Sequence, residues 1–172
     1  KKRCNSKLAL DATASIGLEN NHHYADVLSY SSCKGLFGLT GAAFVAFNST
    51  PANEINQFNL NIYNHINKKM TGPYHAICSL FDVLKSHNDF KYAVVKNKNV
   101  FLKKMSKYLV YNHDEQPNLC TLIDKEVFKK NKNVILYQSR ADISGSVVCH
   151  LGEVHLMKKA KGRIIDFLKF HK

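Results

Sequence analysis

The chain has 172 residues, of which 45% are hydrophobic and 22% charged, a composition typical of a globular protein with a substantial core. Its apolar runs are short, since "LTGAAFVAF" stops at Asn48, and none approaches the roughly 20 apolar residues of a membrane-spanning helix. The formal net charge of +12 raises the question of a nucleic-acid partner. Most basic residues are lysines, however, whereas phosphate and base-edge recognition favours arginine. We therefore expect a solvated lysine-rich surface, with no nucleic-acid and no membrane partner.

Three short apolar stretches open the chain. "KLALDA" (7–12) is an apolar run that ends in an acid, "ADVLSYSS" (25–32) and "GAAFVAF" (41–47) follow it, and glycines between the last two indicate a tight turn. Such runs are typical of buried parallel strands. We expect three strands of a mostly parallel sheet, with Asp11 at its carboxyl edge, where ligands bind in open α/β sheets.

The middle of the chain is predicted to be helical. The segment 58–69 is ambiguous between strand and helix, but Thr71-Gly72-Pro73 is typical of a helix start. One apolar stripe then follows, formed by Tyr74, Ile77, Leu80, Phe81 and Leu84. A second helix is expected to begin at Asn88 or Asp89 and to run to about Leu109.

The last third alternates between the two kinds of element. We predict strands at 118–123, 133–138 and 146–151, a short helix at 125–131 and an amphipathic helix at 157–170. Strands interleaved with helices indicate an α/β fold.

The cysteines argue against two kinds of site. They lie at Cys4, Cys33, Cys78, Cys120 and Cys149, an odd number that is widely spaced and forms no C-x-x-C pair. This spacing predicts neither a disulfide framework nor a zinc site, and the histidines form no H-x-x-x-H pair. With no signal-peptide pattern at the start, we expect a cytoplasmic protein without a metal.

Asp11 and Lys34 form the most informative pair of residues. Each is predicted to lie at the carboxyl end of neighbouring strands, and this combination suits pyridoxal phosphate chemistry. A neutral lysine amine forms a Schiff base with the cofactor aldehyde, and a carboxylate keeps the pyridine nitrogen protonated. The spacing alone is weak evidence, because a lysine after a strand is usually a solvated side chain.

The surrounding blocks strengthen this interpretation. "ALDATASIG", "ADVLSYSSCKGLFGLTGAAFVAF" and "MTGPYHAICSLFDVL", followed by "HLGEV" near the end, resemble successive blocks of the class V, fold-type I aminotransferases that depend on pyridoxal phosphate. The closest likeness is to the 2-aminoethylphosphonate:pyruvate transaminases. The resemblance covers only the C-terminal half of such an enzyme. It implies that residues 1–88 belong to the cofactor-binding large domain and that residues 89–172 form a small C-terminal α/β domain.

The resemblance also implies roles for individual residues. Lys34 would be the catalytic lysine that forms the Schiff base, and Asp11 would face the pyridine nitrogen. Thr71 would reach the cofactor phosphate of the other subunit in a homodimer, although it could equally be a plain helix cap. Ser32 would hydrogen-bond near the cofactor, or would serve ordinary turn chemistry. The substrates would be an amine donor and a 2-oxo acid.

The sequence departs from the family pattern at one important position. Val147 stands where the family has an arginine that binds the substrate carboxylate. Either Arg140 substitutes for it, or the substrate differs, or activity is lost, and Arg140 could also be an ordinary loop cation.

Family members also carry their phosphate-binding loop and the aromatic residue that stacks on the ring N-terminal to Asp11. We therefore expect that the N-terminal half of the enzyme is required, and that this chain alone binds the cofactor poorly. Three alternatives stay open: another class V enzyme of lyase or desulfurase type, an inactive truncated remnant, and a basic module that binds nucleic acid.

Overall fold

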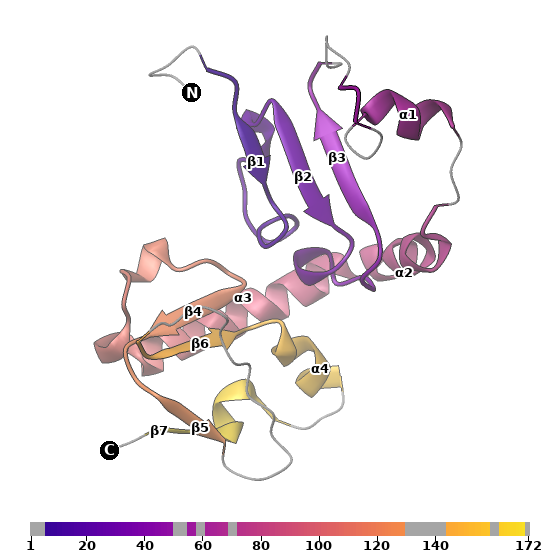
Figure 1. The fold of residues 1–172 in the computed structure, drawn as a ribbon. Coiled ribbons are helices and arrows are strands. Elements are labelled where there is room, and N and C mark those ends of the chain that lie inside the picture. Colours follow the sequence, from indigo (N-terminus) through magenta and orange to yellow (C-terminus); the bar gives the residue numbers. More distant parts are fainter. Residues whose placement is uncertain are drawn as a thin grey trace.

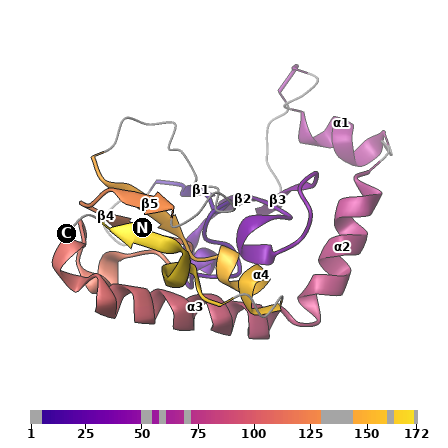
Figure 2. The ribbon, with the colours of Figure 1, turned by 90° about the horizontal axis from the view of Figure 1, so that it is seen from below.

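The computed structural model describes residues 6–49, 55–57, 61–68, 72–129, 144–158 and 162–170. Its elements form two groups, which the long helix α3 (His87–Lys104) connects (Figure 1). The first group contains β1 (Ala9–Asp11), β2 (Val27–Ser31), β3 (Ala43–Phe47), α1 (Ile62–Asn67) and α2 (Tyr74–Leu84). The second group contains β4 (Cys120–Ile123), β5 (Val127–Lys129), β6 (Ser146–Cys149), α4 (Gly152–Lys158) and β7 (Leu168–Phe170). In the view of Figure 2, α3 runs along the lower edge of the picture with the second group directly above it. α2 meets one end of α3 at a steep angle (Figure 2).

The first group is built on a three-stranded sheet in the order β1-β2-β3. β1 pairs with β2 in parallel, as expected, but β3 is antiparallel to β2, which corrects the expectation of a third parallel strand. The reason is the short connection, because a parallel crossover needs a dozen or more residues, usually including a helix. The connection, residues 32–42, contains the 3₁₀ turn Lys34–Leu36 but no crossover helix, and the backbone N–H of Ser32 donates to the carbonyl of Ala42.

The second group surrounds a hydrophobic core that α3 shares with three strands. Its buried members are Phe101, Met105, Ile123, Val148 and Leu168. β4 and β6 form one antiparallel pair, and β5 and β7 form another. The helix-spaced apolar positions predicted after Asp89 thus bury one face of α3 against the strands.

Two predictions in this group are wrong. Residues 127–129 form a strand and not a helix, because pairing with β7 overrides the local helical pattern. The expected helix at 157–170 is replaced by the end of α4, a 3₁₀ turn at Ile164–Phe167 and β7. Gly162 has a φ of 93°, a backbone conformation that an α-helix cannot contain. The strand predicted at 133–138 lies outside the described residues.

The apolar stripe of α2 is present, but most of it faces solvent. Ala76 is the buried residue of this helix, whereas Tyr74, Ile77, Phe81 and Leu84 are exposed, with Tyr74 at 79% and Phe81 at 68%. A helix with an uncovered apolar stripe has surface left for a further element or chain. None of the helices in the described ranges is long and apolar enough to cross a membrane.

Candidate functional site

Asp11 ends β1 at the edge of the sheet, as the sequence predicts. It is the register partner of Ser29 in β2. Its Oδ1 atom accepts two hydrogen bonds, one from the Thr13 hydroxyl at 2.6 Å and one from the Thr13 backbone N–H at 2.9 Å. These bonds, with a contribution from the positive charge of Lys34, lower the pKa of the Asp11 carboxyl, although partial desolvation opposes them. Asp11 is therefore a carboxylate at neutral pH.

Lys34 follows the end of β2, at the same edge of the sheet as Asp11. It is exposed and begins a 3₁₀ turn, Lys34–Leu36. Its φ of 54° is in the left-handed region, where few residues other than glycine are found. Its positive charge makes a small contribution to the lowered pKa of Asp11, after the hydrogen bonds from Thr13. The two residues that the sequence paired thus lie at or just after the same ends of neighbouring parallel strands, and their joint role stays a prediction.

Close backbone packing holds the Lys34 turn against the turn that follows Asp11. A Cβ atom added to Gly35 would lie 2.1 Å from the carbonyl oxygen of Ile16, and one added to Gly17 would lie 2.7 Å from the carbonyl oxygen of Gly35. Such approaches are open only to glycine. His87, at the start of α3, adds a contact of 2.9 Å between its Nε2 atom and the Gly35 carbonyl oxygen. Asp11 and Lys34 therefore lie on two turns that are fixed to each other.

Ser32 lies two residues before Lys34, and its hydroxyl is engaged within the protein. It is fully buried, it donates to the Leu39 carbonyl at 2.5 Å, and it accepts from the Ala42 backbone N–H at 3.3 Å. These bonds close the loop that carries Lys34. This is the turn role that the sequence left open, and a contact between Ser32 and a cofactor stays a prediction.

Four other residues named in the sequence have different outcomes. Thr71 and Arg140 lie outside the described residues, so their roles stay predictions. Val147 lies on β6 opposite Leu122 of β4. Cys33 is partly buried, and its Sγ atom lies 3.2 Å from the Ser31 hydroxyl, consistent with a packed side chain.

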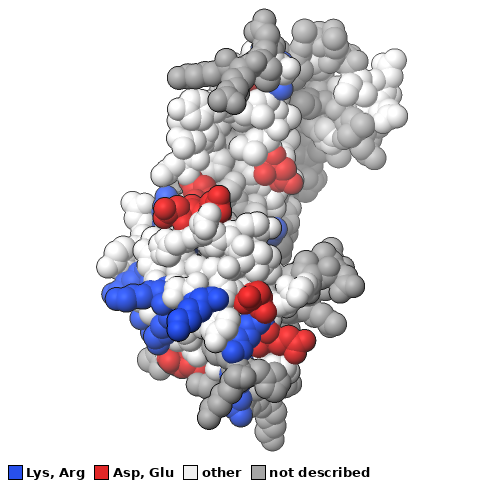
Figure 3. All heavy atoms as spheres, turned by 90° about the vertical axis from the view of Figure 1, so that its left-hand side faces the viewer, with Lys and Arg blue, Asp and Glu red and all other residues white. Residues whose placement is uncertain are grey.

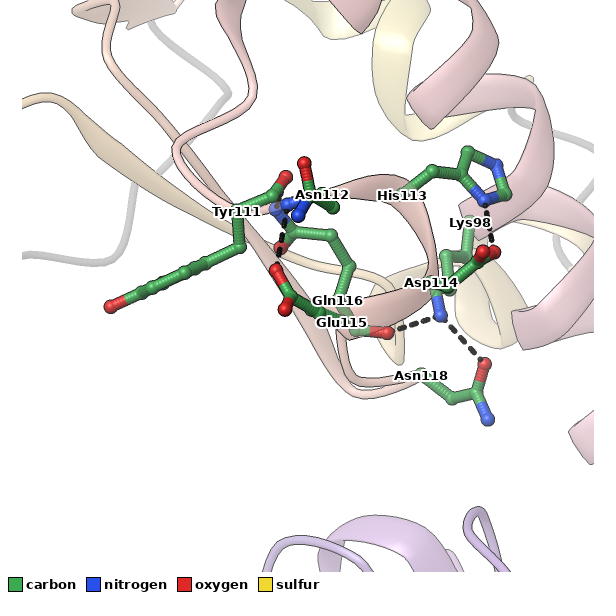
Figure 4. Close-up of polar contacts among 8 residues, drawn as sticks. All are labelled: Lys98, Tyr111, Asn112, His113, Asp114, Glu115, Gln116 and Asn118. Carbon is green, nitrogen blue, oxygen red and sulfur yellow. Dashed lines mark hydrogen bonds and ion pairs between the residues drawn. The ribbon is translucent and has the colours of Figure 1, made fainter.

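The structure reveals a second unusual lysine that sequence patterns missed. Lys98 of α3 is buried, and its amine donates to the Gln116 backbone carbonyl and to Asn118 Oδ1, the latter at 3.3 Å (Figure 4). Burial lowers the pKa of Lys98, against the opposing charges of Glu19 and Asp114. Both acceptors belong to the loop that it supports, so Lys98 has a structural role. Its position among the apolar residues of α3 was the only sequence signal.

Asn118 connects this loop to the first group of elements. Its backbone N–H donates to Glu19 Oε1 at 2.6 Å, and its side-chain amide donates to Glu19 Oε2 at 3.0 Å and to the Leu18 carbonyl at 3.1 Å. Glu19 and Leu18 follow Asp11 by fewer than ten residues. The two groups are thus joined near the Asp11 turn by polar contacts as well as by α3.

A buried polar network lies where α3, β4 and α4 meet. His150 Nε2 is 2.8 Å from the Thr121 hydroxyl, and Asn97 connects His150 Nδ1 to both carboxylate oxygens of Glu153 at 3.1–3.2 Å. Burial, with the charge of Lys98, lowers the pKa of His150 from 6.5 to about 4. His150 is therefore neutral at physiological pH, and this interior network lacks the exposure of a ligand site. The described residues also contain no group of three His, Cys, Asp or Glu side chains placed to hold a metal ion.

On the face drawn in Figure 3, the described basic and acidic side chains lie side by side. Lys and Arg gather over the lower part of this face, and acidic side chains lie beside them (Figure 3). The upper part of this face is mostly uncharged, with a few acidic side chains. Mixed signs of this kind are typical of a solvated surface.

Comparison with known proteins supports the fold. No protein-family model and no curated protein matches this sequence. Among solved structures, an alanine–glyoxylate aminotransferase from Nostoc sp. is similar, with a TM-score of 0.57 and 14% sequence identity. The match covers 75% of this chain and 40% of the aminotransferase, so the chain spans well under half the length of that enzyme. The expected α/β class, with the fold of part of an aminotransferase, is confirmed.

Proposed function

We propose that this chain is the C-terminal part of a pyridoxal phosphate-dependent transaminase that moves an amino group from an amine donor to a 2-oxo acid. The observation that carries the proposal is the placement of Asp11 and Lys34 at one edge of the same sheet, in a chain whose fold is similar to part of an aminotransferase. Among the transaminases, we favour an activity like that of the 2-aminoethylphosphonate:pyruvate enzymes, because the blocks around these residues resemble theirs.

Asp11 and Lys34 fit the pyridine nitrogen and the aldehyde of the cofactor. Both hydrogen bonds from Thr13 end on Asp11 Oδ1, so within the described part of the chain Oδ2 can accept a hydrogen bond from a protonated pyridine nitrogen. The lowered pKa of Asp11 keeps this carboxylate charged, as that contact requires. Lys34 is exposed, and within the described part of the chain its amine makes no hydrogen bond, so it is available for covalent attachment.

Lys34 has a second proposed task. When bound, pyridoxal phosphate supplies an electron sink that stabilises a carbanion on the substrate. The Lys34 amine, once released from the cofactor, would take the proton from the substrate carbon as a general base and return it as a general acid. The rigid glycine contacts around Gly35 support this role, because proton transfer requires a fixed position of the amine.

We further propose that activity requires the rest of the enzyme and a homodimer. The exposed stripe on α2 and the half-exposed Val45 of β3 offer apolar surface for these parts to cover. Thr71 would contact the cofactor phosphate in the partner subunit. Arg140 would bind the substrate carboxylate in place of the family arginine, whose position Val147 occupies. A cytoplasmic location is part of the same proposal.

The test is to trap the cofactor on the protein. Pyridoxal phosphate is added at equimolar concentration to the chain co-expressed with the N-terminal part of its gene product, the adduct is reduced with borohydride, and the modified peptide is mapped by mass spectrometry. We expect a pyridoxyl group on Lys34, loss of that adduct in Lys34→Ala, and no change in Lys96→Ala, which removes an exposed lysine of α3. A dominant adduct on another lysine would overturn the assignment.

Two further measurements separate the alternatives. Product analysis with amine donors and pyruvate distinguishes a transaminase, which yields alanine, from a lyase or desulfurase. An affinity for DNA or RNA that falls steeply with salt, without any Lys34 adduct, would instead favour a nucleic-acid-binding module.

A further inference from the structure

Two cysteines that are distant in the sequence face each other across β4 and β6. Cys120 begins β4, Cys149 ends β6, and the two are direct register partners in this antiparallel pair. Side chains of directly opposite residues project from the same face of a sheet. Both thiols are free.

The backbone hydrogen bonds of neighbouring residues show which of the two types of antiparallel pair Cys120 and Cys149 form. The backbone N–H of His150 donates to the Leu119 carbonyl at 2.8 Å, so the neighbouring opposite pair, Leu119 and His150, is of the hydrogen-bonded type. On the other side, the Leu122 carbonyl accepts from Val110 and therefore points away from β6. Hydrogen-bonded and non-hydrogen-bonded pairs alternate along an antiparallel ladder. Cys120 and Cys149 are therefore a non-hydrogen-bonded pair.

Non-hydrogen-bonded pairs bring side chains closest together. Their Cα atoms are about 4.5 Å apart, at the short end of the range of about 4.4–6.8 Å in which a disulfide can form. The backbone therefore need not open for the two sulfur atoms to bond. The charge of Cys149 also contributes, after burial, to raising the pKa of Cys120, which agrees with close thiols.

The pair is open to reagents from one side. Thr121 and Val148, the next residues along the two strands, are buried on the opposite face of the ladder. Cys149 is exposed and Cys120 is partly buried, so the two thiols lie on the face that does not line the core. An oxidant can reach Cys149 first, with Cys120 behind it.

We propose that Cys120 and Cys149 form a reversible redox site, in which a peroxide converts the facing thiols into a cross-strand disulfide. This site is separate from Asp11 and Lys34, and it goes beyond the proposed function.

The chemistry balances with hydrogen peroxide as oxidant. The Cys149 thiol loses its proton, the thiolate attacks one peroxide oxygen, and the O–O bond breaks, giving a sulfenic acid and a hydroxide that takes up the released proton to form one water. The Cys120 sulfur then attacks the Cys149 sulfur, forming the S–S bond and releasing the second water. Two thiols lose two electrons and two protons in all. A dithiol reductant reverses the reaction by thiol exchange.

The test uses the whole chain and peptide mapping. The reduced protein is treated with hydrogen peroxide, the remaining thiols are blocked, and the protein is digested with trypsin without reduction. Cleavage after Lys125 and Arg140 separates the two cysteines into different peptides. We expect one cross-linked species that joins the Cys120 and Cys149 peptides, with the mass of two hydrogen atoms lost, and its disappearance after dithiothreitol.

Matched variants make the assignment specific. Cys149→Ser and Cys120→Ser should each abolish the cross-link, whereas Cys33→Ser and Cys78→Ser should leave its yield unchanged. In Cys120→Ser, Cys149 should stop at the sulfenic acid, which dimedone labels. The proposal is overturned if Cys149 in the unaltered protein passes to sulfinic acid without a cross-link, or if Cys33 and Cys78 cross-link to an equal extent.

Discussion

The Nε2 atom of His87 lies 2.9 Å from the carbonyl oxygen of Gly35, although 52 positions separate the two residues in the chain. This contact ties the start of α3 to the turn that carries Lys34. The backbone of Gly35 also packs against Ile16, on the turn after Asp11. Lys34 is therefore positioned by two segments, one before it and one after it in the sequence.

Replacing Gly35 with alanine should disrupt this packing. The new Cβ atom would lie 2.1 Å from the Ile16 carbonyl oxygen, a backbone atom that cannot rotate away. We expect Gly35→Ala to lower the free energy of unfolding by about 1–3 kcal/mol. Gly72→Ala is the control, because an added Cβ there meets nothing within 4 Å, and it should change stability by less than about 0.5 kcal/mol. Urea unfolding of both variants measures the difference, and equal midpoints would contradict the close packing.

The Thr13 hydroxyl should control the titration of Asp11. It is the largest cause of the lowered pKa of this carboxyl, so Thr13→Ala should raise the Asp11 pKa toward its ordinary value of 3.8, while Thr13→Ser should preserve it. The lowered pKa means that any stability contributed by ionised Asp11 is present above pH 3.8 and is lost as the pH falls through the folded-state value. NMR titration of the Asp11 side-chain carboxyl carbon measures the pKa. Identical pKa values in the alanine and serine variants would disprove the role of the hydroxyl.

Part of this site could be predicted from sequence because local signals and tertiary structure agree there. The acid after "LAL" and the lysine between β2 and the glycine turn both take the strand-end positions that the pattern indicates. The antiparallel direction of β3 was missed, since an apolar run alone does not reveal strand direction. The facing of Cys120 and Cys149 was also missed, because their register depends on pairing between segments that lie far apart in the chain.

The same reasoning explains the failures near the C-terminus. Residues 125–131 have a short helical pattern, but Val127 and Phe128 gain more from pairing with β7 than from a single helical turn. Helix periodicity likewise found the stripe on α2 but could not tell which face is covered. In the structure α2 buries the side that carries Ala76, so the stripe faces solvent. Ala76 is a small residue and carries little hydrophobic signal in the sequence.

His150 should make stability depend on pH. Its pKa is lowered from 6.5 to about 4, so between these values the unfolded chain binds more protons than the folded protein. The free energy of unfolding should therefore rise with pH between about pH 4 and 6.5, by about 3 kcal/mol in all, and should fall again on acidification. His150→Gln should remove most of this slope, whereas His113→Gln, at an exposed side chain, should retain it. Urea midpoints from pH 4 to 7 provide the measurement, and an unchanged slope in His150→Gln would assign the effect to another group.

Glu153 and Arg163 should contribute more to stability than a surface ion pair. The Glu153 side chain is 1% exposed, and Arg163 Nε donates to its Oε1 at 3.1 Å. Arg163→Met would leave a buried carboxylate without its cation and should cost about 2–3 kcal/mol, less than for a fully buried pair because Arg163 is partly exposed. The control is Lys85→Met, which breaks an exposed pair with Asp82 and should cost about 0–1 kcal/mol. Equal losses in thermal unfolding would show that burial adds nothing here.

Phe81 and Phe101 should respond differently to truncation, although both occupy apolar positions of helical patterns. Phe101 is 1% exposed in the core that α3 shares with the strands, so Phe101→Ala should lower the free energy of unfolding by about 3–5 kcal/mol. Phe81 is 68% exposed, so Phe81→Ala should change it by no more than about 0.5 kcal/mol. Urea unfolding of this chain alone compares the two. If the N-terminal part proposed above covers α2, co-expression with that part should make Phe81→Ala measurably destabilising, while the loss in Phe101→Ala stays the same. A large loss for Phe81→Ala in the isolated chain would contradict the outward direction of the stripe.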